Sequence, residues 1–169
     1  MATNLEFIKS ASGSSVSSLS VTDCFSDKYD VYMVSISKLD VTAQNYLDAR
    51  LIDSVGVDST TNYDYAGLEL VAGATFAEKK NTGQSLWANL SYQNTGADDG
   101  VGLAMYIYNP YDSSSYTFFN SHSTSYYSAS GIGYKTIGVH KVAEQITGIQ
   151  FLPRSGSFDN ITINVFGVK

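Results

Sequence analysis

The stretch Ile161-Thr162-Ile163-Asn164-Val165-Phe166 alternates apolar and polar side chains with a period of two. Successive side chains of an extended chain point to opposite faces, so residues 161, 163 and 165 share one face and residues 162 and 164 the other. This pattern is typical of a β-strand with one face on a hydrophobic core and the other in water. The segment therefore predicts a half-buried strand.

A second stretch, Tyr29-Asp30-Val31-Tyr32-Met33-Val34-Ser35-Ile36, carries apolar side chains on both faces. A strand of this kind is covered on both sides or lies at a subunit contact. We therefore expect it to be a central strand of its sheet.

Strand signals recur roughly every ten to fifteen residues, which is the spacing of a sandwich or barrel and not of strand-helix alternation. The best helical candidate, Thr42 to Ala49, is short and runs into a strand pattern. The expected strands are Leu5 to Lys9, Ser15 to Val21, Tyr29 to Ser37, Tyr46 to Asp53, Gly67 to Ala72, Ser85 to Tyr92, Val101 to Asn109, Tyr116 to Phe119, Ile132 to Val142, Gln145 to Leu152 and Asn160 to Val168.

Composition supports the same class. The 169 residues include 13 Tyr, 8 Phe and 14 Gly but only 2 Pro, which favours pleated surfaces joined by tight turns. We predict one all-β domain over residues 1–169, an antiparallel β-sandwich of about eight to eleven strands with little helix. As an alternative to strands within the sandwich, residues 1–20 could form an extended N-terminal arm.

Three segments are rich in Ser, Thr, Tyr and Asp: Ser10 to Ser20, Asp53 to Tyr65 and Asp112 to Ser130. Such low-complexity segments are expected to be loops or solvent-facing edge strands.

The net charge of −6 argues against nucleic acid as a partner, because binding phosphates needs clustered Lys and Arg. Neither a long apolar run nor a signal-peptide pattern is visible, so we expect no membrane partner and a protein kept in a cytoplasm or released by lysis. Cys24 is the single cysteine and cannot form an intramolecular disulfide, so we expect it to be a small buried hydrophobe.

Motifs of catalysis are weak. His122 and His140 show no metal-ligand spacing, and His122 lies in a polar segment expected to be an exposed loop. Asp98-Asp99 and the loop from Asp58 to Asp64 could supply paired carboxylates for glycoside hydrolysis, but adjacent loop aspartates more often form turns. The spaced pattern of a calcium loop is absent. We expect no enzyme activity, no metal and no cofactor.

Tyrosine is the one enriched feature, and its amphipathic ring suits protein interfaces and sugar faces alike. The aromatic residues expected at an interface or on a glycan are Trp87, Tyr108, Tyr111, Tyr126 and Tyr127. The simpler interpretation is that many of these rings fill the core and pair across strands.

The closing segment Asn160-Ile161-Thr162-Ile163-Asn164-Val165-Phe166-Gly167-Val168-Lys169 resembles the C-terminal strand of small virion structural proteins of tailed bacteriophages. The resemblance extends to Ile146-Thr147-Gly148-Ile149-Gln150-Phe151, to Tyr29-Asp30-Val31-Tyr32 and to Leu47-Asp48-Ala49-Arg50-Leu51. It implies a jelly-roll-like sandwich that decorates a capsid, or forms a head fibre or part of a tail fibre or baseplate. It brings no catalytic residues.

The leading hypothesis is therefore a non-enzymatic virion component that contacts other virion proteins and forms a symmetric homo-oligomer, with a trimer expected. One alternative is a carbohydrate-binding adhesin that recognises a host-surface glycan. Another is a small polysaccharide hydrolase, which requires two carboxylates facing each other across a cleft.

Overall fold

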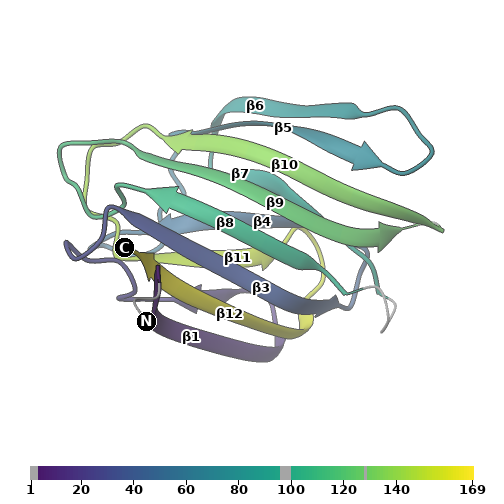
Figure 1. Cartoon of the computed structure of the whole chain (residues 1–169), viewed down its shortest axis with the longest axis horizontal. Coiled ribbons are helices and arrows are strands. Elements are labelled where there is room, and N and C mark those ends of the chain that lie inside the picture. The colour runs from purple at the N-terminus through teal and green to yellow at the C-terminus, as the bar shows by residue number, and fades with distance from the viewer. Residues whose placement is uncertain (1–3, 96–99, 128) are drawn as a thin grey trace.

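The computed structural model describes residues 4–95, 100–127 and 129–169, and within these ranges it contains twelve strands and no helix (Figure 1). The strands are β1 (Leu5–Val16), β2 (Leu19–Val21), β3 (Val31–Val41), β4 (Asn45–Ile52), β5 (Tyr63–Val71), β6 (Ala77–Gln84), β7 (Trp87–Gln93), β8 (Gly102–Tyr108), β9 (Thr117–Tyr127), β10 (Ser130–His140), β11 (Gly148–Pro153) and β12 (Phe158–Val168).

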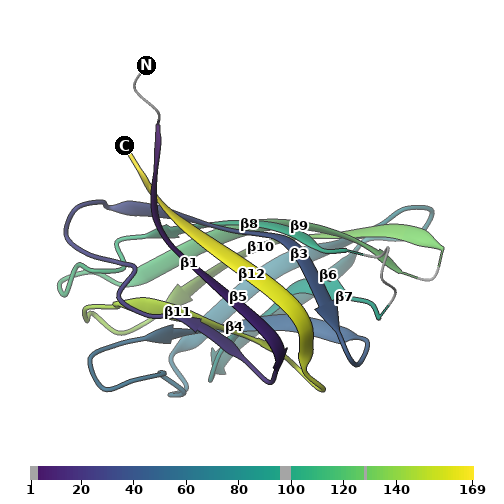
Figure 2. The same ribbon diagram turned by 90° about the horizontal axis from the view of Figure 1, so that it is seen from below.

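The strands form two antiparallel sheets that pack face to face. The larger sheet has eight strands in the order β1-β12-β3-β8-β9-β10-β5-β6, and the smaller has four in the order β2-β11-β4-β7. In Figure 2, which is turned by 90° from Figure 1, β4 and β11 form a layer separate from the sheet that contains β8, β9 and β10. The predicted all-β antiparallel sandwich is confirmed, with twelve strands in place of the eight to eleven expected.

Without β5, β6, β9 and β10, the remaining eight strands make two sheets of four, β1-β12-β3-β8 facing β2-β11-β4-β7. Neighbours in space are far apart in sequence, and the chain crosses repeatedly from one sheet to the other. This is jelly-roll topology. The other four strands extend only the first sheet, which leaves part of it wider than its partner.

The core lies between the sheets and consists of the inward-facing residues of both. Ile161, Ile163 and Val165 of β12 are almost fully buried, as their alternation predicts. At the centre, Trp87 packs against Tyr63 and Phe119, with ring centroids 5.5 and 4.4 Å apart. Its indole N–H donates to the Val139 carbonyl at 3.2 Å, which satisfies its one polar atom.

Gly167 has a specific packing role in the closing strand. A Cβ added there would collide with the ring of Tyr29, which lies directly over the glycine. Tyr29 in turn packs edge-to-face on Tyr32 of β3, with centroids 5.8 Å apart. The glycine of the Phe166-Gly167-Val168 ending thus lets an aromatic ring cover the strand.

An ion pair between the buried Asp48 and the partly exposed Arg154 ties the smaller sheet to the turn after β11. Arg154 donates to both carboxylate oxygens of Asp48, at 2.9 and 3.1 Å, and the Asn89 backbone N–H donates to the same carboxylate at 3.0 Å. Burial raises the pKa of Asp48 despite these hydrogen bonds. The paired groups satisfy one another, which is the requirement for a charge in a buried position.

All eleven predicted strand segments fall on observed strands, and the Tyr29 to Ile36 stretch lies on β3, which pairs on both edges with β12 and β8. Sequence reasoning missed β6, whose sequence AEKKNTGQ has no apolar face. This strand lies at the sheet edge, where charged side chains are tolerated and discourage pairing with other chains.

One expectation was wrong, and two alternatives raised by the sequence differ from what the structure shows. β9, within the Asp112 to Ser130 segment expected to be loop or edge strand, is an interior strand paired with β8 and β10. Residues 5–16 pair with β12 as strand β1 and do not form an extended arm. The stretch Thr42 to Ala49, the best helical candidate, contains no helix and runs into β4, as its strand pattern predicted, with Leu47 and Ala49 in the core.

Cys24 is buried, as expected, and its thiol donates to the Val21 carbonyl at 3.2 Å. Among the described residues no helix is long and apolar enough to cross a membrane.

Candidate functional site

The outer face of the eight-stranded sheet is turned away from the smaller sheet, yet it carries a continuous row of mostly apolar side chains. Cross-strand pairing places one residue of each strand in this row. We call it the first row, and its members in order are Phe7, Phe166, Met33, Tyr106, Asn120, Ile137, Ala66 and Lys80. The sequence separates these residues widely, so only the sheet aligns them.

A second row runs beside the first, two residues further along each strand. Its members are Val31, Tyr108, Phe118, Val139 and Asp64. Several of these apolar side chains are exposed: Ile137 and Phe7 by 58%, and Phe118 by 43%. An antiparallel sheet with a solvated face normally presents polar residues there, so the two rows are a departure that indicates a contact surface.

The neighbouring row on the other side follows the usual rule. Its members are Ser10, Asn164, Ser35, Ala104, His122, Lys135, Leu68 and Glu78. Six of the eight are polar or ionisable, the exceptions being Ala104 and Leu68, and Leu68 is the one large apolar member. The outer face is therefore divided, with an apolar half along the first two rows and a polar half beyond them.

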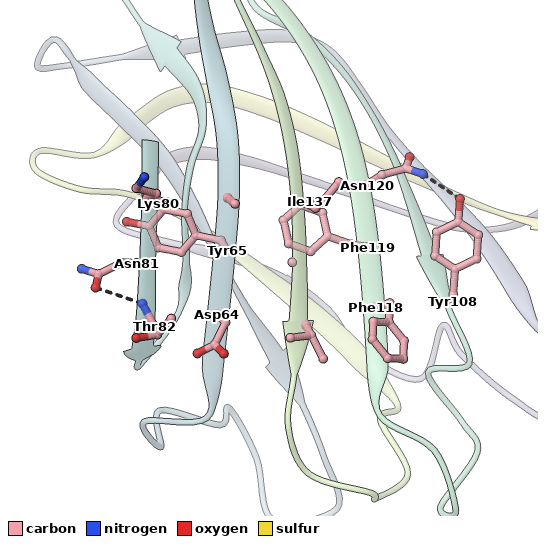
Figure 3. Close-up of a pocket in the computed structure, with 13 residues that line it drawn as sticks. Asp64, Tyr65, Lys80, Asn81, Thr82, Tyr108, Phe118, Phe119, Asn120 and Ile137 are labelled. Atoms are coloured by element: carbon pink, nitrogen blue, oxygen red, sulfur yellow. Dashed lines mark hydrogen bonds between the residues drawn. The ribbon is translucent and has the colours of Figure 1, made fainter. Parts of the chain in front are cut away.

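A groove of about 820 Å³ occupies the apolar half between β6 and β8 (Figure 3). Tyr108, Phe118 and Ile137 supply its apolar lining, and Lys80 and Thr82 of β6 contribute polar groups at the opposite side. Figure 3 also shows Asn120 turned toward Tyr108, whose hydroxyl accepts a hydrogen bond from the Asn120 amide at 2.8 Å. The groove thus combines aromatic rings with hydrogen-bonding groups.

The one carboxylate of the groove is already paired. Asp64 forms an ion pair with Lys141 at 2.9 Å and accepts a hydrogen bond from the Gly83 backbone N–H at 2.8 Å. The hydrogen bond from Lys141 is the main cause that lowers the pKa of Asp64. Asp64 therefore stays ionised near neutral pH and adds little uncompensated charge to the surface.

The five aromatic residues expected to make contacts do not form one set. Trp87 is fully buried in the core and offers no surface to a sugar or a partner. Tyr108 lies in the groove, whereas Tyr126 and Tyr127 are exposed near the far end of β9, where Tyr127 packs on Tyr92 at 4.7 Å. Tyr111 lines a small separate pocket in the loop after β8.

A second cluster lies at the end of β10, on the inner face of that strand. His140 is fully buried, and its Nε2 lies 2.5 Å from Asp58 Oδ2. Its other ring nitrogen, Nδ1, faces Glu144 Oε1 at 3.9 Å. Although 82 residues separate Asp58 from His140, the β4–β5 loop and the strand end bring them together.

The electrostatics of this cluster differ between the two acids. Burial by itself would raise the pKa of the Asp58 carboxyl, but hydrogen bonds from Thr60 and His140 outweigh this effect. The net result is a pKa below the usual range of an aspartate. Burial raises the pKa of Glu144. The attraction of His140 acts to lower it, and repulsion from Asp53 and Asp58 acts to raise it further. Asp58 is thus the firmly ionised partner of His140.

Of the carboxylates considered for hydrolysis or calcium binding, the two in the described part of the chain, Asp58 and Asp64, are each held by a different cation or imidazole. Asp98 and Asp99 lie outside the described residues. Within the Asp58 to Asp64 loop, Asp58 is engaged by His140 and Asp64 by Lys141. The structure therefore gives these two acids separate partners and no shared cleft.

Neither a scan against known protein families nor a search of curated protein sequences finds a match for this chain. The function must be argued from the residues and their geometry.

Sequence reasoning missed both the two rows and the His140 cluster. The rows leave a weak signal, since Tyr106, Tyr108 and Ile137 sit at positions of their strands where alternation predicts polar residues. His122 is exposed, as expected, but lies within β9 and not in a loop. For His140 no local signal exists, because its partner comes from a distant loop.

Proposed function

We propose that the chain is a non-enzymatic structural component of a bacteriophage particle, held in a homo-oligomer or against other virion proteins through the apolar rows of its outer face. The observation that carries the proposal is the alignment of two apolar rows on the outer, solvent-facing side of the larger sheet. An exposed apolar surface of this kind marks an interaction site.

The charge distribution suits contact between copies. The chain carries a net charge of −6, so most surfaces of two copies repel each other. The two rows contain a single carboxylate, Asp64, which Lys141 neutralises, and one lysine, Lys80. The first row also contains Tyr106 and Met33, and aromatic residues and methionine are enriched at protein interfaces.

The assignment to a virion is an analogy at the level of fold. Jelly rolls are common in viral capsid proteins, but also in lectins and cupins, and a fold does not by itself determine function. The resemblance of the closing strand to small virion proteins adds to the analogy. Cryo-electron microscopy of intact particles would test it directly, and density for this chain on the particle surface is the expected result.

The assembly surface is tested by Ile137→Asp, which places a charge in the centre of the first row. We expect the association constant of the oligomer to fall at least tenfold, since desolvating the new carboxylate costs more than about 1.4 kcal/mol. Analytical ultracentrifugation over a range of concentrations measures it. The matched control is Val55→Asp, the same kind of change at a loop residue that is 95% exposed.

At concentrations low enough for the parent chain to be dissociated, both variants should keep its unfolding midpoint, because neither side chain lies in the core. A parent chain that is monomeric at every concentration, or an Ile137→Asp variant with unchanged association, would contradict assembly through this face.

The groove favours a second candidate function, glycan binding. Sugar rings stack on aromatic faces and hydrogen-bond at their rims, and the groove offers Tyr108 and Phe118 for stacking with Lys80, Thr82 and Asn120 as polar partners. On a glycan array we expect binding that Tyr108→Ala removes while the fold is retained. Absence of binding by the parent chain would eliminate this candidate and leave the assembly proposal untouched.

A further inference from the structure

We infer that His140 and Glu144 bind a divalent transition-metal ion such as zinc, with Asp58 orienting the imidazole from behind. The site lies at the end of β10 and the start of the β10–β11 loop. His140 follows Val139 of the second row, but its side chain points to the opposite, inner face of the strand. The site is therefore separate from the groove and from the proposed assembly surface.

The first observation is a buried nitrogen without a hydrogen-bond partner. His140 is fully buried, and among the described residues its Nδ1 finds no hydrogen-bond partner. The Glu144 carboxylate is 3.9 Å away, which is too far for a hydrogen bond. Buried polar atoms are nearly always satisfied, so an atom left open and aimed at a carboxylate indicates a missing third group.

The second observation is the separation of the two groups. Zinc binds imidazole nitrogen and carboxylate oxygen at about 2.1 Å, so one ion can join two ligand atoms that are up to about 4.2 Å apart. The 3.9 Å between Nδ1 and Oε1 falls within this span. A small rotation of Glu144, whose side chain is 31% exposed, would shorten this separation and so narrow the angle between the two ligands at the metal.

The third observation is that the outer support of such a site is already built. Histidines that bind metals almost always donate their other ring N–H to a carboxylate or carbonyl, which fixes the tautomer. Here Nε2 meets Asp58 Oδ2 at 2.5 Å, and Asp58 is itself held by the Thr60 backbone N–H at 2.7 Å. The Tyr63 ring packs on the imidazole with centroids 4.6 Å apart.

The ligand chemistry selects the class of ion. Imidazole nitrogen favours zinc and its first-row neighbours over magnesium and calcium, and the carboxylates supply the negative charge. The ligand atoms of Asp58, His140 and Glu144 all lie within 4.8 Å of one another. A bound ion would fix Glu144 of the β10–β11 loop to His140 at the end of β10, which Asp58 of the β4–β5 loop already holds, so we assign the ion a structural role.

The test is titration of the full-length, chelator-treated chain with zinc chloride by isothermal calorimetry. We expect one ion per chain and a zinc-dependent rise in the unfolding temperature, because the ion binds the folded state. Glu144→Gln should weaken binding at least tenfold, since a ligand is lost. Glu78→Gln, at an exposed position of β6, is the matched control and should bind as the parent does.

His122 is the other histidine of the chain, and His122→Ala should leave binding unchanged. Nitrogen NMR of the imidazole supplies a readout that does not depend on a variant: zinc should shift the Nδ1 resonance of His140 while Nε2 stays protonated. The rival is a protonated His140 held between two carboxylates without any metal. Ring signals that show two N–H groups and ignore zinc, no stoichiometric binding, or unchanged affinity in Glu144→Gln would each overturn the proposal.

Discussion

Deletion of residues 161–169 is expected to abolish soluble folding. These residues form most of β12, which pairs along one edge with β1 and along the other with β3. Their removal strips Ile161, Ile163 and Val165 from the core and exposes two strand edges at once. Unpaired edges beside an open core template aggregation. Circular dichroism and the soluble fraction after expression measure the outcome.

A pair of point variants separates loss of the core from loss of the strand itself. Ile163→Lys buries a charge between the sheets and should unfold the chain, whereas Thr162→Lys points to the exposed face and should be tolerated. Recovery of a folded, monomeric chain that lacks residues 161–169 would show that β12 is dispensable and that its interior position is not essential.

The second large effect is expected from Trp87→Ala, which should lower the free energy of unfolding by about 3–5 kcal/mol. The side chain is fully buried, packs on Tyr63 and Phe119, and has its N–H bonded to the Val139 carbonyl. Truncation leaves a cavity in the centre of the core and frees that carbonyl. Denaturant unfolding followed by circular dichroism measures it, since the variant has no tryptophan to fluoresce.

Trp87→Phe retains most of the apolar volume and should cost less than Trp87→Ala. Tyr108→Ala, at a half-buried position in the groove, serves as the control outside the core and should change the free energy of unfolding far less. If Trp87→Ala had the same unfolding midpoint as the parent, the central packing described above would be wrong. If Trp87→Ala also lost glycan binding, the loss would report damage to the fold, because Trp87 is buried and cannot contact a glycan.

The sequence predicted surface roles for aromatic residues without distinguishing inside from outside. Trp87 and Tyr108 both belong to strands whose neighbours include apolar residues on each face, so local alternation does not decide which side of each strand meets the second sheet. In β7 nearly every residue is buried, so its burial shows no alternation between two faces. Exposure there depends on the packing of distant strands, which no local pattern encodes.

By itself the sequence determined the all-β class, the approximate place of eleven strands and the core-facing side of β12. Side-chain alternation follows from the geometry of a single extended strand, so a short segment is enough to reveal it. The order and register of the strands were decided only by the tertiary structure. Because pairing joins segments far apart in the chain, it alone set Ile137 beside Asn120 in the first row and Asp58 against His140.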